Sequence, residues 1–348
     1  MNPYILATLL LSLGLGTTIT FASSHWLLAW MGLEINTLAI LPLMAQQHHP
    51  RAVEATTKYF LTQATGAATL LFASTTNAWL TGQWDILQMS HPLATTLAIL
   101  ALSLKVGLAP LHTWLPEVLQ GLDLTTGLIL STWQKLAPFA LLLQIQPADP
   151  TILIILGITS TLVGGWGGLN QTQLRKIMAY SSTAHLGWMI LVLQFSPSLT
   201  LLTLFTYLVM TSSTFLVLKL NKSTSINMLA TSWAKAPVLT TLTPLILLSL
   251  GGLPPLTGFM PKWLILQELT KQNLAPIATL AALTALLSLY FYLRLTYAMT
   301  LTMSPNNVTG TAPWRLHSSQ LTLPLATLTT ATILLLPLTP TMLTLLTV

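Results

Sequence analysis

Four ionisable side chains stand in segments that are otherwise apolar: Glu34, Lys105, Lys135 and Lys262. Burial away from water penalises a charged ammonium, so a buried lysine releases its proton more readily. A carboxylate that approaches the lysine reverses this effect. Pairing and separation of Glu34 and Lys105 would therefore load and unload a proton. Ionisable residues within apolar segments most often mark such paths, and the pattern predicts a chain of proton-carrying groups.

Two histidines extend this candidate set. His112 follows the glycine- and proline-containing stretch 107–110, and His185 lies within an apolar segment. Either imidazole can relay protons through water, although a packing role is equally open for His112 and is favoured for His185. The lysines also have structural interpretations, as buried ion pairs or as side chains that reach back to a membrane surface. The second of these fits Lys262 best.

The composition indicates which kind of element must hold these residues. Of the 348 residues, 53% are hydrophobic and only 6% are charged, and the mean hydropathy is +0.73. So few charges cannot cover the surface of a soluble protein of this size, which excludes soluble enzymes, nucleic-acid-binding proteins and disordered tails. The chain has no cysteine, which excludes disulfides, iron–sulfur ligation and thiolate metal sites. We therefore expect an all-α polytopic membrane protein.

A spanning helix needs about 20 mostly apolar residues, and this length predicts about eleven spans in one transmembrane domain, residues 1–348. The expected spans are 3–22, 25–45, 57–80, 92–116, 123–143, 151–169, 177–195, 198–219, 238–271, 274–298 and 322–346. Glycine and proline interrupt two of them, at 107–110 and 252–255, which is typical of internally repeated transporters. We expect repeat halves near 1–145 and 150–300, followed by the C-terminal helix 322–346.

The remaining basic residues predict an orientation. Lys and Arg number 13 against 7 Asp and Glu, a net charge of +6. With the expected spans, the connectors on the N-terminal side carry most of the basic residues, whereas the opposite side carries only Lys271. Those on the N-terminal side are Arg51, Lys58, Arg175, Lys176, Lys219, Lys222, Lys235, Arg294 and Arg315. The positive-inside rule then places the N-terminus on the side of synthesis.

Three runs of the sequence carry a family resemblance: residues 30–36, 105–118 and 179–188, with further similarity at 251–259 and 261–263. On these residues the chain resembles the antiporter-like membrane-arm subunits of respiratory complex I, the NADH:ubiquinone oxidoreductase, in their vertebrate mitochondrial type. The resemblance implies two inverted repeats, each with a broken helix. It also implies that the first helices of the longer members are absent, which agrees with the expected number of spans.

The resemblance also implies a role for each buried charge. Glu34 and Lys105 match the family's glutamate–lysine pair of the first repeat, Lys135 matches its connecting lysine, and Lys262 matches its terminal lysine. It implies a multi-pass subunit of the mitochondrial inner membrane, with the N-terminus in the matrix and the C-terminus in the intermembrane space. Protons would move from the matrix to the intermembrane space, driven by redox chemistry in other subunits.

The same resemblance implies the cofactors and partners. NADH, FMN, iron–sulfur clusters and ubiquinone would bind to partner subunits, and we expect no cofactor or metal on this chain. The expected partners are other membrane-arm subunits and phospholipids, and not nucleic acid. Two other functions stay open: a structural spacer in the same arm without its own proton channel, and a stand-alone sodium/proton exchanger. The exchanger is disfavoured because Glu34 is the only carboxylate near the middle of an expected span.

Overall fold

The computed structural model of the chain describes residues 2–46, 48–145, 147, 149–234, 237–301 and 322–347. The basic residues Lys235 and Arg315, which contribute to the predicted orientation, lie outside these ranges. Within them the chain forms helices and connecting turns, and its β pairing is limited to two isolated bridges. The predicted all-α class is therefore confirmed. The chain forms two compact units, residues 1–156 and 157–348.

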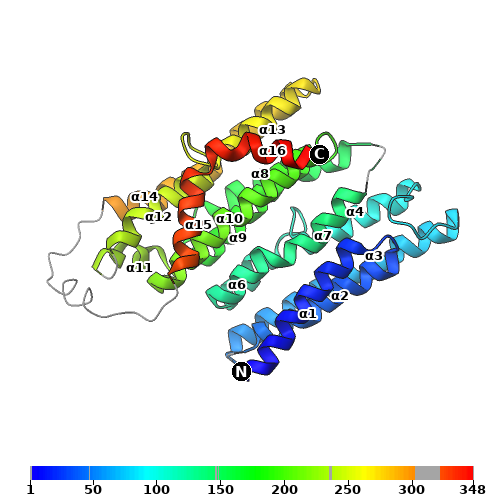
Figure 1. Cartoon of the computed structure of the whole chain (residues 1–348), viewed down its shortest axis with the longest axis horizontal. Helices are drawn as coiled ribbons and strands as arrows, with labels where there is room; N and C mark the ends of the chain where they lie inside the picture. The colour runs from blue at the N-terminus through cyan, green and yellow to red at the C-terminus, as the bar shows by residue number, and fades with distance from the viewer. Residues whose placement is uncertain are drawn as a thin grey trace. The chain divides into compact units, whose positions relative to one another are not determined.

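The first unit contains both the first glycine–proline break and three of the four ionisable candidates, Glu34, Lys105 and Lys135. In this unit α1 packs on α2, α2 on α3, and α3 on α4, and α4 also contacts α7 (Figure 1). Helix α3 contacts α5 as well. The helices are α1 (Pro3–Ala22), α2 (Trp26–Met44), α3 (Pro50–Thr81), α4 (Pro92–Val106), α5 (Trp114–Gly121), α6 (Leu124–Ser131) and α7 (Trp133–Gln144).

The second unit is organised around one long helix, α10, which contacts α9, α12, α13, α15 and α16. The boundary between the units falls within α8. The helices are α8 (Thr151–Gly168), α9 (Leu174–Val192), α10 (Pro197–Asn221), α11 (Ile226–Ala230), α12 (Pro237–Gly251), α13 (Phe259–Lys271), α14 (Ala275–Thr300), α15 (Leu323–Leu334) and α16 (Thr339–Thr347). Short 3₁₀ turns lie at Thr231–Ala234 and Leu336–Leu338.

Local sequence explains where these helices begin and how they tolerate polar residues. Proline occupies the first turn of α1, α3, α4, α10, α14 and α15, where its missing N–H costs nothing. Threonine and serine hydroxyls within the helices donate to carbonyls three or four residues earlier, as at Thr20 to Thr17 (2.7 Å) and Ser181 to Met178 (2.8 Å). Such bonds satisfy the hydroxyls without a partner helix.

Five described helices, α1, α2, α8, α10 and α14, are long and apolar enough to cross a membrane, and the bent pair α15–α16 makes a sixth if it is one span. Three of the other five expected spans differ for identifiable reasons. The helices α4 and α12 are apolar but short, because each ends at a break. A kink at Thr132 divides the expected span 123–143 into α6 and α7. This break was not predicted.

Candidate functional site

The first break sets the position of Lys105. Helix α4 ends at Val106 because Gly107 adopts a left-handed conformation, with φ of 89°. The amides of Gly107 and Leu108 both donate to the Ser103 carbonyl, at 2.9 Å each. Leu108 is thus withdrawn from its regular helical acceptor, the carbonyl of Leu104. Lys105 consequently lies in the last turn of α4, beside backbone acceptors that need other donors.

Side chains from two other helices supply donors at this end of α4. The indole Nε1 of Trp114, the first residue of α5, donates to the Leu104 carbonyl at 3.0 Å. The amide Nε2 of Gln63, on α3, donates to the Lys105 carbonyl at 3.5 Å. In lipid a freed carbonyl must be satisfied by protein or by water in a cavity. The break is therefore stabilised by side chains from α3 and α5.

The side chain of Lys105 is almost fully buried, with 6% of its surface exposed. Its stem packs on α3 at Gly66, where an added Cβ would lie 3.2 Å from Lys105 Cγ. Its Nζ has no hydrogen-bond partner among the described residues. A buried ammonium without a partner is costly, so this atom gains from any donor or acceptor rearrangement that brings water or a carboxylate to it.

Glu34 lies on α2 and is partly buried. Its carboxylate accepts a hydrogen bond from the Thr37 hydroxyl at 3.2 Å, and its charge acts on Lys105 through space. No ion pair joins the two side chains in the part of the chain that the structure describes. The predicted glutamate–lysine pair thus stands in a separated arrangement.

A small polar cavity brings Lys105 and Lys135 together. Its volume is about 20 Å³, which is room for about one water molecule. Lys135 reaches it from the first turn of α7, just after the kink at Thr132, and is only 2% exposed. The other polar groups that line the cavity are Asn36, Thr37, Tyr59, Gln63, Trp114 and Gln134. Glu34 contacts the edge of the cavity through Thr37, whose hydroxyl donates a hydrogen bond to its carboxylate.

His112 lies in the break between α4 and α5 and is buried. Its carbonyl accepts from the Leu115 amide at 3.0 Å, which begins the first turn of α5. It is not among the residues that line the polar cavity. The structure therefore places His112 beside the break and outside the lining of the polar cavity.

Lys262 belongs to the second unit and lies in the first turn of α13. Its Nζ donates to the carbonyl of Gly251, the last residue of α12, at 2.8 Å. The negative end of a helix dipole favours a cation at this point. Gly252 adopts φ of 78° and leaves room for the lysine, since an added Cβ would lie 2.9 Å from Lys262 Cδ. This lysine thus bonds directly to the end of the broken helix.

His185 lies mid-helix in α9 and is partly buried. Its ring contacts that of Tyr207 on α10, with centroids 5.8 Å apart and planes at 45°. The pair packs α9 against α10 within the second unit. The geometry at His185 is that of an aromatic packing contact.

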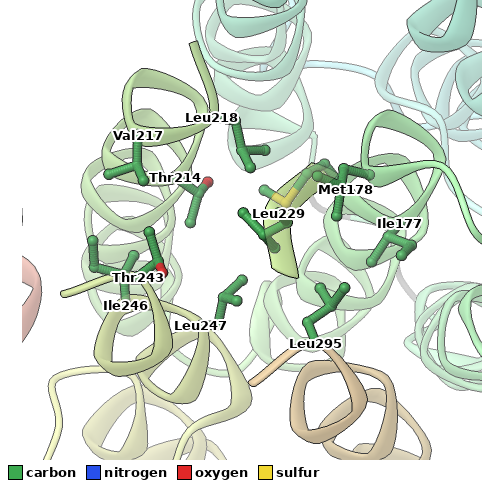
Figure 2. A pocket seen from close by; sticks show the side chains of 11 residues that line it. Ile177, Met178, Thr214, Val217, Leu218, Leu229, Thr243, Ile246, Leu247 and Leu295 are labelled. Carbon is green, nitrogen blue, oxygen red and sulfur yellow. The ribbon is translucent and has the colours of Figure 1, made fainter. Parts of the chain in front are cut away.

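A second cavity of about 20 Å³ lies within the second unit and differs in chemistry. Figure 2 shows it surrounded by aliphatic side chains, Met178 and two threonines. Both hydroxyls are already used, because Thr214 donates to Thr211 and Thr243 donates to Thr240 and to the Met299 sulfur. A buried water needs two to four polar partners. This cavity is apolar and does not belong to the ionisable site.

An exposed ion-pair cluster ties α5 to α3. Lys58 Nζ lies 2.7 Å from Glu54 Oε1 and 2.8 Å from Glu117 Oε2. Exposed pairs contribute little to stability by themselves. Their geometric effect is to hold α5, and with it Trp114, against the first turns of α3.

Sequence reasoning missed several residues of the polar cavity. Asn36, Gln63 and Gln134 could have been singled out from the sequence, because an amide side chain in an apolar span is costly unless it is hydrogen-bonded. Tyr59 and Trp114 carried a weaker signal, since large aromatic residues usually pack in cores. Only the structure shows that these five side chains surround the same lysines.

Comparison with known proteins identifies the family. A family model described as "NADH:quinone oxidoreductase/Mrp antiporter, TM" matches residues 23–288, and one described as "NADH dehydrogenase subunit 2 C-terminus" matches residues 289–343. NADH-ubiquinone oxidoreductase chain 2 of Tetraodon nigroviridis is 78% identical over 345 residues, covering 99% of both chains.

Solved structures agree in fold. A chain of respiratory complex I from Thermus thermophilus with bound aureothin aligns with a TM-score of 0.85 and 30% identity, over 97% of this chain and 78% of that one. A chain of the Mrp complex from Dietzia sp. aligns with a TM-score of 0.82 at 16% identity, over 97% of this chain and 76% of that one, and supports the fold alone.

The broken helices, the buried lysines and these matches define an antiporter-like membrane subunit. Within that class, the chain belongs to the NADH-ubiquinone oxidoreductase chain 2 family.

Proposed function

We propose that this chain translocates protons as a membrane-arm subunit of NADH:ubiquinone oxidoreductase, through its buried charges. The supporting observation is the polar cavity that Lys105 and Lys135 both line. The ammonium of Lys105 has no hydrogen-bond partner among the described residues. A group in this situation gains from any nearby water or carboxylate, so small rearrangements change its proton affinity. Membership of the chain 2 family supports the same function.

In the proposed cycle, redox chemistry in partner subunits changes the interaction between Glu34 and Lys105. A proton then passes between Lys105 and Lys135 through water in the cavity, and Lys262 carries it in the second unit, with His112 and His185 as relays. Moving one charge against about 150 mV requires roughly 3.5 kcal/mol. A tenfold change in proton affinity corresponds to about 1.4 kcal/mol, so a few-hundredfold change at one lysine is sufficient.

The test is the proton yield per NADH oxidised by the assembled complex with Lys105→Met, Lys135→Met or Glu34→Gln. Each substitution should lower the yield while the complex still assembles. The matched control is Lys271→Met, which removes an exposed lysine paired with Glu268 at 3.6 Å and should leave the yield unchanged. A normal yield in all three variants would refute the proposal.

The second candidate is the structural spacer, and the Lys262–Gly251 bond is the observation that favours it. A spacer predicts that the lysine variants reduce the amount of assembled complex and leave the proton yield of the remaining complex unaltered. The ratio of yield to assembly therefore separates the two functions.

In this proposal the chain crosses the membrane about eleven times, with about 20 residues in each span. Each helix that ends at a break crosses together with the helix that follows the break. It places the chain in the mitochondrial inner membrane, with the N-terminus in the matrix and the C-terminus in the intermembrane space. The partners are other membrane-arm subunits and phospholipids, while NADH, FMN, iron–sulfur clusters and ubiquinone bind to partner subunits. The excess of lysine and arginine in the connectors on the N-terminal side, against Lys271 alone on the opposite side, supports this orientation.

The absence of cysteine from the sequence makes the orientation testable. Single cysteines at two exposed positions, Leu87→Cys and Lys222→Cys, provide labels on the two expected sides. An impermeant maleimide applied from the intermembrane-space side should label the first and spare the second. Labelling with the opposite preference would contradict the proposed topology.

A further inference from the structure

We propose that Trp114 and Gln63 are positioning residues for Lys105, which hold the end of α4 so that the ammonium faces the polar cavity. This inference rests on the proposed function of Lys105. The Trp114 indole donates to the carbonyl of Leu104 at 3.0 Å, and the Gln63 amide donates to the carbonyl of Lys105 itself at 3.5 Å. Both also line the cavity into which Lys105 extends.

The two broken helices show what these donors prevent. At the end of α12, the Gly251 carbonyl is satisfied by a lysine, Lys262, whose ammonium is thereby bound at 2.8 Å. At the end of α4, Trp114 and Gln63 satisfy the carbonyls and the ammonium of Lys105 stays without a partner. An unfilled carbonyl beside Lys105 would offer it the same kind of acceptor that Lys262 uses. Occupation of these carbonyls therefore directs Lys105 to the cavity.

Both donors are fixed to one helix. Gln63 is part of α3, and the ring of Trp114 packs edge-on against Tyr59 of α3 with centroids 5.7 Å apart. The Lys58–Glu117 ion pair and the close approach of Gly121 to the Arg51 carbonyl hold the rest of α5 on α3. Helices α3 and α5 thus act as a clamp on the last turn of α4.

The principal test is Trp114→Phe in the assembled complex, which removes the indole N–H and keeps an aromatic ring in contact with Tyr59. The matched control is Trp26→Phe, because Trp26 is also a buried tryptophan and its indole N–H donates to no group in the described structure. We expect the rate of proton pumping at fixed NADH oxidation to fall about two- to tenfold in Trp114→Phe, and to stay unchanged in Trp26→Phe.

A double-variant comparison distinguishes positioning from a general loss of structure. If Trp114 acts through Lys105, Trp114→Phe should have no further effect on pumping in a Lys105→Met background. An additional loss there, or equal pumping by Trp114→Phe and Trp26→Phe, would overturn the inference. If Trp114→Phe does not assemble, Gln63→Met removes the second donor and is held to the same criteria.

The design also separates this inference from the function on which it rests. Normal pumping by Lys105→Met, Lys135→Met and Glu34→Gln refutes the proposed function and the positioning role together. Normal pumping by Lys105→Met, with a loss in the other two variants, refutes the positioning role and leaves the proposed function standing. Lost pumping by Lys105→Met with normal pumping by both Trp114→Phe and Gln63→Met refutes the positioning role alone.

Discussion

Replacing Gly252 by alanine should displace Lys262 from the end of α12. Gly252 has φ of 78°, and an alanine in that conformation costs roughly 1–2 kcal/mol. The added Cβ would also lie 2.9 Å from Lys262 Cδ and 3.0 Å from its Nζ. Since the lysine is flexible and the backbone is not, the lysine side chain moves and its 2.8 Å bond to the Gly251 carbonyl is lost.

The magnitude follows from these two contributions. A hydrogen bond to a charged group is worth about 1.5–3 kcal/mol, so Gly252→Ala should destabilise the second unit by about 2.5–5 kcal/mol in total. Gly82→Ala isolates the backbone contribution, because Gly82 has φ of 73° and nothing lies within 4 Å of its added Cβ. The control should therefore lose only roughly 1–2 kcal/mol.

The assay measures two quantities for each variant: the temperature at which the assembled complex loses NADH:ubiquinone activity, and the proton yield per NADH before heating. Gly252→Ala should lower both, whereas Gly82→Ala should lower only the first, and by less. Equal inactivation temperatures with an unchanged yield in both variants would refute the assigned contact between Lys262 and α12.

Two further predictions concern the cavities. Asn36→Leu removes a buried amide whose side-chain atoms have no partner among the described residues, so thermal stability should stay the same or rise, while the proton yield falls because the cavity loses a group that can hold water. An unchanged yield would contradict this prediction. Leu229→Ala enlarges the apolar cavity of Figure 2. It should lower the stability of the complex by about 2–5 kcal/mol and leave the proton yield unchanged. A reduced yield would show that this cavity is part of the proton path.

The sequence was sufficient to locate the breaks in α4 and α12, since glycine and proline have strong local effects on a helix. It was not sufficient to predict the kink at Thr132, which depends on a backbone conformation with φ of −111° and ψ of −70° rather than on a glycine or proline at that residue. This kink matters because it places Lys135 in the first turn of α7 and not in the middle of a continuous helix.

The sequence also could not predict that Lys262 bonds the carbonyl at its break whereas Lys105 does not. Lys105 precedes its break and Lys262 follows its own, and both have glycine and proline nearby. Whether a freed carbonyl is taken by the lysine or by another donor depends on residues far away in the chain, here Gln63 and Trp114. Such tertiary contacts cannot be inferred from local spacing.

The contrast leads to a last prediction about Lys262, which has both a structural bond and a proposed proton-carrying role. Lys262→Met removes both, so it should reduce assembly and proton yield together, because the Gly251 carbonyl loses its donor. Lys262→Gln keeps a donor for that carbonyl and removes the titratable amine. It should therefore recover assembly to near the normal amount while the yield per assembled complex stays low. If Lys262→Gln restores both quantities, Lys262 acts only as a cap on α12, and the proton path in this chain does not pass through it.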